Sequence, residues 1–295
     1  YMNAGEMDNQ GFEGNLSVEI IQRKKLNWRF NVNFGRNTSE VTLANDELYS
    51  DLEVINKMLD GNLAIKGEKL GSMYSFRYGG LARENGYPLF YGKDGKLWHT
   101  ADPKRMELVK SGSIYPDLSG GFDTQLTFDK RLSLSVGFTY NLGGVKRLPS
   151  VYADKNSALN PVANVSTNWK KRWRKPGDEK YTDVPVLYND RVASDFERNV
   201  SAEDRGAAEE CTYFYDLSDF RVAKADFLRL RSVGLSYIMP EKLLKGMGIS
   251  SMMIRFQASN LFVWAHKDWK GLDPETPEAN IPILPSYSLG INVSF

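Results

Sequence analysis

Apolar and polar residues alternate strictly along several long segments of this chain. From position 132 onward every second residue is apolar: Leu132, Leu134, Val136, Phe138, Tyr140 and Leu142. The same rule holds for Leu26, Trp28, Phe30, Val32 and Phe34, with polar residues or glycine between them. A period of two residues is that of a β-strand with one apolar and one polar face. The segment 132–142 is roughly twice as long as a usual strand of a soluble protein.

Five more segments follow this pattern, so the sequence predicts about seven such strands. Four of them keep one phase: 16–20, 118–128, 252–258 and 287–295. The fifth, 227–239, changes phase, because Leu228 and Leu230 occupy even positions whereas Val233 and Leu235 occupy odd ones. One extra residue in a strand produces such a slip, so we expect a β-bulge near Ser232.

The connections between these strands alternate strictly between short and long. Short turns are expected at 22–25, 129–131 and 240–249, whereas roughly 80 residues separate the strands at 37–117 and again at 143–226, and about 20 at 263–283. A soluble sandwich gives no reason for this parity, because both its ends face the same water. In an outer-membrane barrel the periplasmic turns are short and the extracellular loops are long. The parity also assigns 74–81, which alone resembles a strand, to the first long loop.

The pattern therefore predicts an all-β fold, an antiparallel transmembrane β-barrel of which residues 1–295 form the C-terminal part. Seven strands are too few and odd in number for a bacterial barrel, so we expect further strands upstream of Tyr1. Aromatic residues lie on the apolar faces, several near strand ends, as in an interfacial girdle. They are Trp28, Phe30, Phe34, Phe122, Phe128, Tyr140, Tyr237 and Phe256.

Composition excludes several other classes of protein. The mean hydropathy is −0.44, and no apolar run approaches the length of a spanning helix, which excludes a helical membrane protein. A net charge of +1 provides no general attraction for nucleic acid, so no nucleic-acid partner is expected. The single Cys211 excludes an internal disulfide framework. Positions 1–10 lack the pattern of a signal peptide, so the protein is either not exported or the later part of a longer chain.

No constellation of residues predicts catalysis or metal binding. The two histidines, His99 and His266, lie outside nucleophile or metal motifs and are expected to be solvated loop residues. Asp94-Gly95 predicts a hairpin turn rather than a calcium loop, because the other acidic ligands are missing. Paired glycines at 79–80, 120–121 and 143–144 are interpreted as bends at strand ends. We therefore predict no enzyme activity and no cofactor.

Candidate binding residues occur in the long loops and on the polar strand faces. The segment 168–178 places Trp169 and Trp173 among five cations, including Arg172, and could stack on sugars or bases, although a solvated cationic loop is the simpler interpretation. In the first long loop the candidates are Tyr74 and Tyr78. On the polar faces Arg29, Arg229, Arg231 and Arg255 would point into a lumen, where charges cost little.

Several motifs, taken together, resemble those of SusC/RagA-type TonB-dependent outer-membrane transporters of the Bacteroidetes kind. The resemblance runs essentially from end to end. Its residues are Asn3-Ala4-Gly5-Glu6-Met7-Asp8-Asn9-Gln10-Gly11-Phe12-Glu13, Arg172-Trp173 with Pro176-Gly177-Asp178, Asp226 to Val233 with Leu235-Ser236-Tyr237 and Pro240, Ser259-Asn260-Leu261-Phe262, Gly271-Leu272-Asp273-Pro274-Glu275 and Gly290 to Phe295.

The resemblance implies a 22-stranded barrel of the cell outer membrane, of which this chain is roughly the last third. It also implies a plug and a TonB box outside this sequence, and active import of glycan fragments or oligopeptides. The implied partners are a SusD-like surface lipoprotein, the TonB–ExbB–ExbD complex, outer-membrane lipid and the barrel-assembly machinery. Phe295 resembles the terminal signal that this machinery recognises.

Two other functions are considered from the residues. The first is a soluble carbohydrate-binding β-sandwich, with Trp169, Trp173, Trp264 and Trp269 as sugar platforms. The second is a secreted hydrolase that uses carboxylates such as Asp273 and Glu275, although nothing in the sequence fixes their separation. Solubility of the parent protein without detergent would favour the sandwich, and heat-modifiable migration in a detergent gel would favour the barrel.

Overall fold

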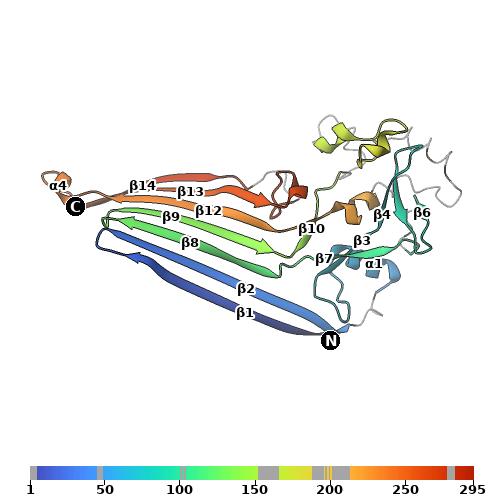
Figure 1. Cartoon of the computed structure of the whole chain (residues 1–295), viewed down its shortest axis with the longest axis horizontal. Helices are drawn as coiled ribbons and strands as arrows, with labels where there is room; N and C mark the ends of the chain where they lie inside the picture. The colour runs from blue at the N-terminus through green and yellow to red at the C-terminus, as the bar shows by residue number, and fades with distance from the viewer. Residues whose placement is uncertain are drawn as a thin grey trace. The chain divides into compact units, whose positions relative to one another are not determined.

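The chain divides into two compact units, which are described separately (Figure 1). The structure, a computed structural model, describes residues 5–44, 49–99, 102, 104–151, 166–187, 196, 198, 200, 213–277 and 283–295. The sheet unit consists of Asn9–Ser39, Pro116–Gly144 and Lys224–Phe295, and the loop unit of Tyr1–Asp8, Glu40–Tyr115 and Val145–Ala223. Cys211 and the first two residues of the motif at positions 3–13 lie outside the described residues.

The sheet unit is built on one seven-stranded sheet, whose strands lie side by side in the order in which they occur in the sequence, β1-β2-β8-β9-β12-β13-β14. Every pair from β2–β8 onward is antiparallel. The seven predicted strands are thus confirmed, although β1, β2 and β13 are longer than the alternation indicated. The bounds are β1 Gly5–Gln22, β2 Leu26–Ala44, β8 Leu118–Phe128, β9 Leu132–Leu142, β12 Phe227–Ile238, β13 Ser251–Ala265 and β14 Ser286–Ser294.

The predicted bulge is present in β12. Its register with both β9 and β13 shifts between Leu230 and Ser232. Against β9 the extra residue is Arg231, whereas against β13 the extra residue lies in β13, where Asn260 and Leu261 stand opposite Arg231. The shift returns the apolar residues after it to the same face as those before it. The alternation in the sequence therefore predicted this feature correctly.

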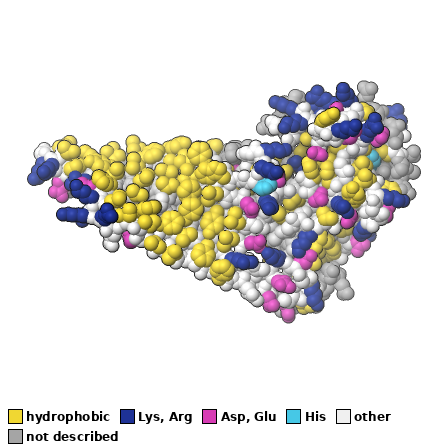
Figure 2. Space-filling model, viewed as in Figure 1, with side chains coloured by type: hydrophobic (Ala, Val, Ile, Leu, Met, Phe, Trp, Pro, Cys, Tyr) yellow, Lys and Arg dark blue, Asp and Glu magenta, His cyan; other side chains and the backbone are white. Residues whose placement is uncertain are grey.

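Cross-strand pairing gathers the side chains into rows that are apolar on one face and polar on the other. One row joins Trp28, Leu126, Leu134, Leu235, Phe256 and Leu289, and the next joins Arg29, Gln125, Ser135, Gly234, Gln257 and Ser288. The apolar side chains are exposed rather than packed against a second sheet: Leu289 is 72% exposed to solvent and Trp264 is 54% exposed. Figure 2 shows this hydrophobic surface over the long strands.

Such a broad apolar surface is unfavourable in water, which indicates that it contacts another apolar surface. It also removes the basis of the β-sandwich hypothesis, in which the apolar face would pack inside. The eight aromatic residues assigned to a girdle follow the apolar positions, whereas their place at a membrane boundary stays a prediction. Among the described residues, no helix has the length and apolar character needed to cross a membrane.

The short connections differ from one another in structure. Arg23, Lys24 and Lys25 join β1 to β2, and Asp129 and Lys130 form a tight turn with φ values of 48° and 58°. Two successive residues at positive φ suit the right-handed twist of a hairpin. The third connection, predicted as a short turn, instead contains the one-turn helix α4, Glu241–Leu244, in which Leu244 is buried.

The loop unit contains the two long insertions and has secondary structure of its own. Residues 74–81 lie in β3 and β4, outside the seven-stranded sheet, so their assignment to a loop is confirmed. The helix α1 begins at a capping box formed by Ser50 and Glu53, and ends at Gly61 in the left-handed region. The bounds are α1 Asp51–Asp60, β3 Ser72–Phe76, β4 Tyr78–Leu81, β5 Pro88–Tyr91, β6 Leu97–Trp98, β7 Leu108–Ser113, β10 Val145–Arg147, η2 Thr167–Lys171, η3 Asp178–Lys180, η4 Asp219–Arg221 and β11 Val222–Lys224.

Both insertions contribute to one hydrophobic core in the loop unit. Phe76 and Phe90 come from the first insertion and Trp169 and Tyr215 from the second, and all four are buried in the same cluster. Backbone hydrogen bonds join the insertions as well, from Phe76 N to Leu217 O and from Val186 N to Gly86 O. The two insertions therefore fold as one unit rather than as two separate loops.

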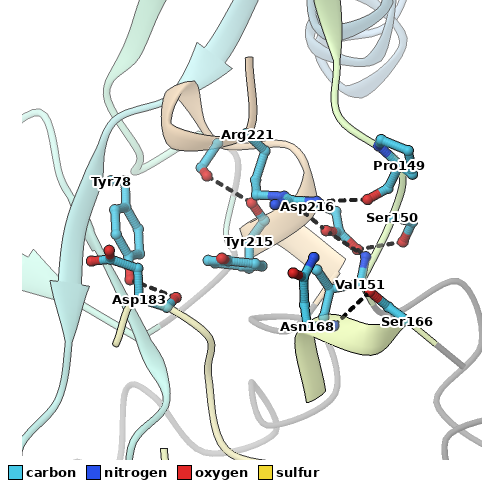
Figure 3. A network of polar contacts seen from close by, with 11 residues as sticks. Tyr78, Pro149, Ser150, Val151, Ser166, Asn168, Asp183, Tyr215, Asp216 and Arg221 are labelled. Atoms are coloured by element: carbon cyan, nitrogen blue, oxygen red, sulfur yellow. Dashed lines mark hydrogen bonds and ion pairs between the residues drawn. The ribbon is translucent and has the colours of Figure 1, made fainter. Parts of the chain in front are cut away.

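A buried carboxylate organises the second insertion (Figure 3). Asp216 accepts hydrogen bonds from the Ser150 hydroxyl and from the backbone N–H of Val151, and lies 3.5 Å from Nε of Arg221. Arg221, itself 6% exposed, also donates to the carbonyl of Pro149. The carboxylate thus compensates a buried guanidinium and holds residues 149–151 beside the turn at 215–221.

We expect Asp216→Asn to lower the free energy of unfolding of the loop unit by about 1–3 kcal/mol, because it leaves the buried Arg221 without its counter-charge. Urea titration of the full-length protein, with the protease resistance of this unit as the readout, measures the change. Ser150→Ala, which removes one hydrogen bond to Asp216 but leaves its charge beside Arg221, should cost clearly less. Equal effects of both variants would show that the charge of Asp216 contributes nothing.

Candidate functional site

The polar face of the sheet unit contains a hollow of about 980 Å³. Small residues are part of its lining, among them Gly121, Ser135, Gly137 and Ser232. Charged and amide side chains line the same hollow: Asn33, Asp123, Arg229, Arg231, Asn260 and Glu275. Because it contains hydrogen-bond donors and acceptors and charges of both signs, this surface is suited to hydrated polar solutes rather than to one tightly held ligand. We take it as the candidate functional site.

Hydrogen bonds order one side of this polar face. Arg29 pairs with Glu19 of β1 at 2.5 Å, while Asn31 donates to Asp123 and accepts from Ser17. Arg29 lies on the polar face, as the alternation predicted, and is half exposed. Its ion pair reduces the positive charge that it presents, and its role in substrate binding stays a prediction.

Arg229 has two carboxylate partners, which the sequence did not reveal. Its guanidinium lies 2.6 Å from Asp273 and 2.5 Å from Glu275, and the side chains of Arg229 and Asp273 are 6% and 7% exposed. These pairs anchor the connection between β13 and β14 to β12. Trp269, fully buried in η5 (Lys267–Trp269), donates to the carbonyl of Lys224 and fixes the same connection. Arg229 therefore has a structural role, and its predicted contact with substrate stays untested.

Asp273 and Glu275 were the carboxylates of the hydrolase hypothesis. Because one guanidinium binds both, they are held as the partners of an ion cluster. The geometry gives no support to an acid–base pair.

Arg231 lies in a different environment from Arg229, which precedes it by two positions in the same strand. It is exposed on the polar face, at the bulge, and the described part of the chain gives it no ion-pair partner. Arg255, which pairs across the sheet with Ser236, is likewise exposed. These two side chains are the cations of the polar face best placed to meet an anionic group of a solute.

Trp169 and Trp173 are not the exposed platforms that the sequence suggested. Each is only 7% exposed and lies in the core of the loop unit. Arg172 turns back and donates to the carbonyl of Trp169 at 3.0 Å. Only the cations around them, Lys170, Lys171, Arg174 and Lys175, are solvent-exposed. Burial of both indoles leaves little ring surface for stacking on a sugar, so we correct the expectation of a solvated loop for these residues.

The packing of Trp173 against Gly86 provides a test. Gly86 has φ of 71°, and a Cβ there would overlap the Trp173 indole. We expect Gly86→Ala to displace this indole, to raise its accessibility to a fluorescence quencher and to lower stability by about 1–3 kcal/mol. Gly95→Ala is the matched control, since its φ is 75° but nothing lies within 4 Å of the added Cβ. Equal effects would show that backbone strain, not contact with Trp173, decides the outcome.

Tyr74 and Tyr78 are held by packing and hydrogen bonds in the loop unit. Burial and the hydrogen bond that the hydroxyl donates to Glu68 raise the pKa of Tyr74 to about 12. Burial also raises the pKa of Tyr78, whose ring packs beside Tyr215 and Phe220. Tyr78 contacts the cluster that contains both tryptophans, which brings three of the predicted loop residues together. Their role in substrate binding stays a prediction.

A partly buried arginine that the sequence did not single out joins the two insertions to each other. Arg147 donates to the carbonyls of Leu59 and Tyr74 and to the hydroxyl of Ser75. Burial lowers the pKa of its guanidinium to about 10. The contact with Leu59 satisfies a carbonyl in the last turn of α1.

The histidines are less solvated than expected. Nδ1 of His99 lies 3.2 Å from the carbonyl of Pro88, and His266 lies 3.1 Å from Asp268. No group of three potential metal ligands occurs among the described residues. At Asp94 the hairpin interpretation is confirmed, since its carboxylate accepts from Lys96 N and Trp98 Nε1. Phe295, 90% exposed, follows β14, and its role in barrel assembly stays a prediction.

Known proteins resemble this chain over its whole length. TonB-dependent receptor P3 of Formosa agariphila is 23% identical over 99% of the chain, and receptor P39 of the same organism is 22% identical over 99%. The solved structure of the RagAB peptide transporter matches 100% of the chain with a TM-score of 0.69 and 25% identity, and the open-open RagAB peptide importer matches with a TM-score of 0.68. No family model matches the sequence.

The chain spans only 29% and 31% of the length of the two curated receptors, and 30% of the RagAB chain. The motifs, the single antiparallel sheet and these likenesses agree with one another, and none points to an enzyme. The recognition made from the motifs is therefore confirmed: over its whole length this chain resembles a segment of a SusC/RagA-type TonB-dependent receptor.

Proposed function

We propose that this chain forms part of an outer-membrane importer that is driven by TonB. The two-faced sheet is the observation that carries the proposal, because an exposed apolar face and a polar, hollowed face suit strands between lipid and an aqueous lumen. In this arrangement the apolar rows contact outer-membrane lipid, and the polar rows line the path of the solute. No bond of the solute changes during transport.

We propose oligopeptides as the substrate class, with glycan fragments as the second candidate. The likeness to the RagAB peptide transporter favours peptides. Arg231 and Arg255 could meet peptide carboxylates, while Asp123 could meet amino groups. A SusD-like surface lipoprotein would bind the receptor on its extracellular side. The TonB–ExbB–ExbD complex would act through a plug, and the barrel-assembly machinery would insert the strands.

Uptake by cells tests the proposal. A strain that expresses the full receptor and its lipoprotein should accumulate a labelled peptide mixture, and deletion of TonB should reduce this uptake to the level of a strain without the receptor. Labelled oligosaccharides, supplied in parallel, distinguish the second candidate. Undiminished uptake after TonB deletion would refute active import, whatever the substrate.

A further inference from the structure

The short turns of the sheet unit carry a concentration of positive charge. We define the basic rim as the cations of the three short connections: Arg23, Lys24, Lys25, Lys130, Arg131, Lys242 and Lys245. All seven are exposed. The same connections contain only two acidic residues, Asp129 and Glu241, so positive charge exceeds negative by five. This local excess contrasts with a net charge of +1 for the whole chain.

Backbone hydrogen bonds show that the rim is continuous. Asp129 N donates to the carbonyl of Lys25 at 2.7 Å, which joins the first turn to the second. Ile238 N donates to the carbonyl of Arg131 at 2.9 Å, which joins the second turn to the third. Cations that are more than one hundred residues apart in sequence therefore lie along one edge of the sheet unit. Ion pairing neutralises little of this charge, since Arg131 and Asp129 approach only to 3.8 Å.

The rim adjoins the apolar face of the sheet. Phe128 and Leu132 flank the second turn and are 54% and 40% exposed. In the third connection Leu243, beside Lys242, is 61% exposed, and Met247, two residues after Lys245, is 64% exposed. Apolar side chains beside cations are typical of a segment at the boundary between acyl chains and headgroups. Figure 2 shows the cations at one end of the hydrophobic surface.

We propose that the basic rim binds anionic phospholipid headgroups of the membrane leaflet at the turn end of the barrel. Exposed cations attract lipid phosphates, and the adjoining apolar side chains accept the acyl chains of the same lipids. The occupant is thus a phospholipid with net negative charge rather than a zwitterionic one. This inference rests on the proposed function, because it requires the apolar face to lie in a bilayer.

The test uses the full receptor, purified and placed in lipid nanodiscs that contain phosphatidylcholine and phosphatidylglycerol. Native mass spectrometry should show phosphatidylglycerol retained in preference to phosphatidylcholine. Replacing one cation of each turn, Lys24→Gln, Lys130→Gln and Lys242→Gln, should lower the affinity for phosphatidylglycerol about tenfold or more, since each cation near an anionic surface contributes roughly fivefold. High salt should weaken binding in the same direction.

The matched control replaces three exposed lysines of the sheet unit outside the short turns, Lys224→Gln, Lys267→Gln and Lys270→Gln. The proposal is overturned if this control loses as much phosphatidylglycerol as the rim variant, if neither loses any, or if lipopolysaccharide or a periplasmic protein displaces phosphatidylglycerol from the rim. Failure of the proposed function is distinguishable, because it would appear as a receptor that neither enters the bilayer nor supports uptake that depends on TonB.

Discussion

Val136→Arg should prevent or strongly weaken assembly of the receptor in the membrane. Val136 lies near the middle of β9, in the apolar row that also contains Phe30, Val233 and Ala258. A cation on the lipid face near the bilayer midplane costs about 2–4 kcal/mol. The folded fraction, measured by heat-modifiable migration of the full receptor and by its urea midpoint in lipid vesicles, should fall accordingly.

Gln125→Arg is the matched control for this variant. Gln125 lies on the polar face of the neighbouring strand, exposed and paired across the sheet with Ser135. An added cation there should change the urea midpoint little, because a water-filled lumen tolerates charge. If the two arginines had the same effect, the assignment of the two faces to lipid and lumen would be wrong.

Arg229→Ala should lower stability by about 3–5 kcal/mol, because it leaves the buried Asp273 without its counter-charge. Glu275, which is 37% exposed, can turn to solvent, whereas Asp273 at 7% cannot do so without moving the backbone. Hydrogen exchange should therefore rise specifically in the connection 266–277. The urea midpoint of the full receptor gives the size of the loss.

Arg231→Ala separates this structural role from a role in transport. Arg231 is exposed and lies two positions along the same strand. Its replacement should leave both hydrogen exchange in 266–277 and the urea midpoint near their original values, while uptake of an acidic peptide declines. The double variant Arg229→Met with Asp273→Leu should recover much of the lost stability, since it removes both buried charges. Failure to recover would show that packing around Arg229, not its charge, fixes the connection.

The sequence predicted the sheet better than the loops, for a physical reason. Along 132–142 each side chain points to one of two environments, so an alternation of apolar and polar residues indicates both the strand and its two faces. In β12 the bulge at Arg231 changes the phase of this alternation, so the sequence indicates the bulge as well. In the loop unit the core is assembled from short segments of both insertions. Trp169 and Trp173 stand among five cations in sequence, and only their contacts with distant residues, such as Gly86 with Trp173, show that they are interior.

The candidate site was predicted in part. Alternation placed Arg29, Arg229 and Arg231 on the polar face correctly, because the face to which a side chain points depends only on its position along the strand. It did not distinguish the paired Arg229 from the exposed Arg231, because the partners of Arg229 lie 44 and 46 residues away in a connection without period. Asp273 and Glu275 belong to a motif that the sequence analysis recognised, but the motif alone did not identify Arg229 as their partner.

The division of one hydrophobic core between two insertions has a consequence for how the receptor forms. Phe76 and Tyr215 meet in one cluster, yet a full hairpin, β8 and β9, separates their insertions in the sequence. Neither insertion can bury its own aromatic residues until the other has been synthesised and brought near. Contacts between such distant positions close slowly. We therefore expect the loop unit to mature after the β8–β9 hairpin has formed, with its apolar side chains exposed to chaperones in the interval.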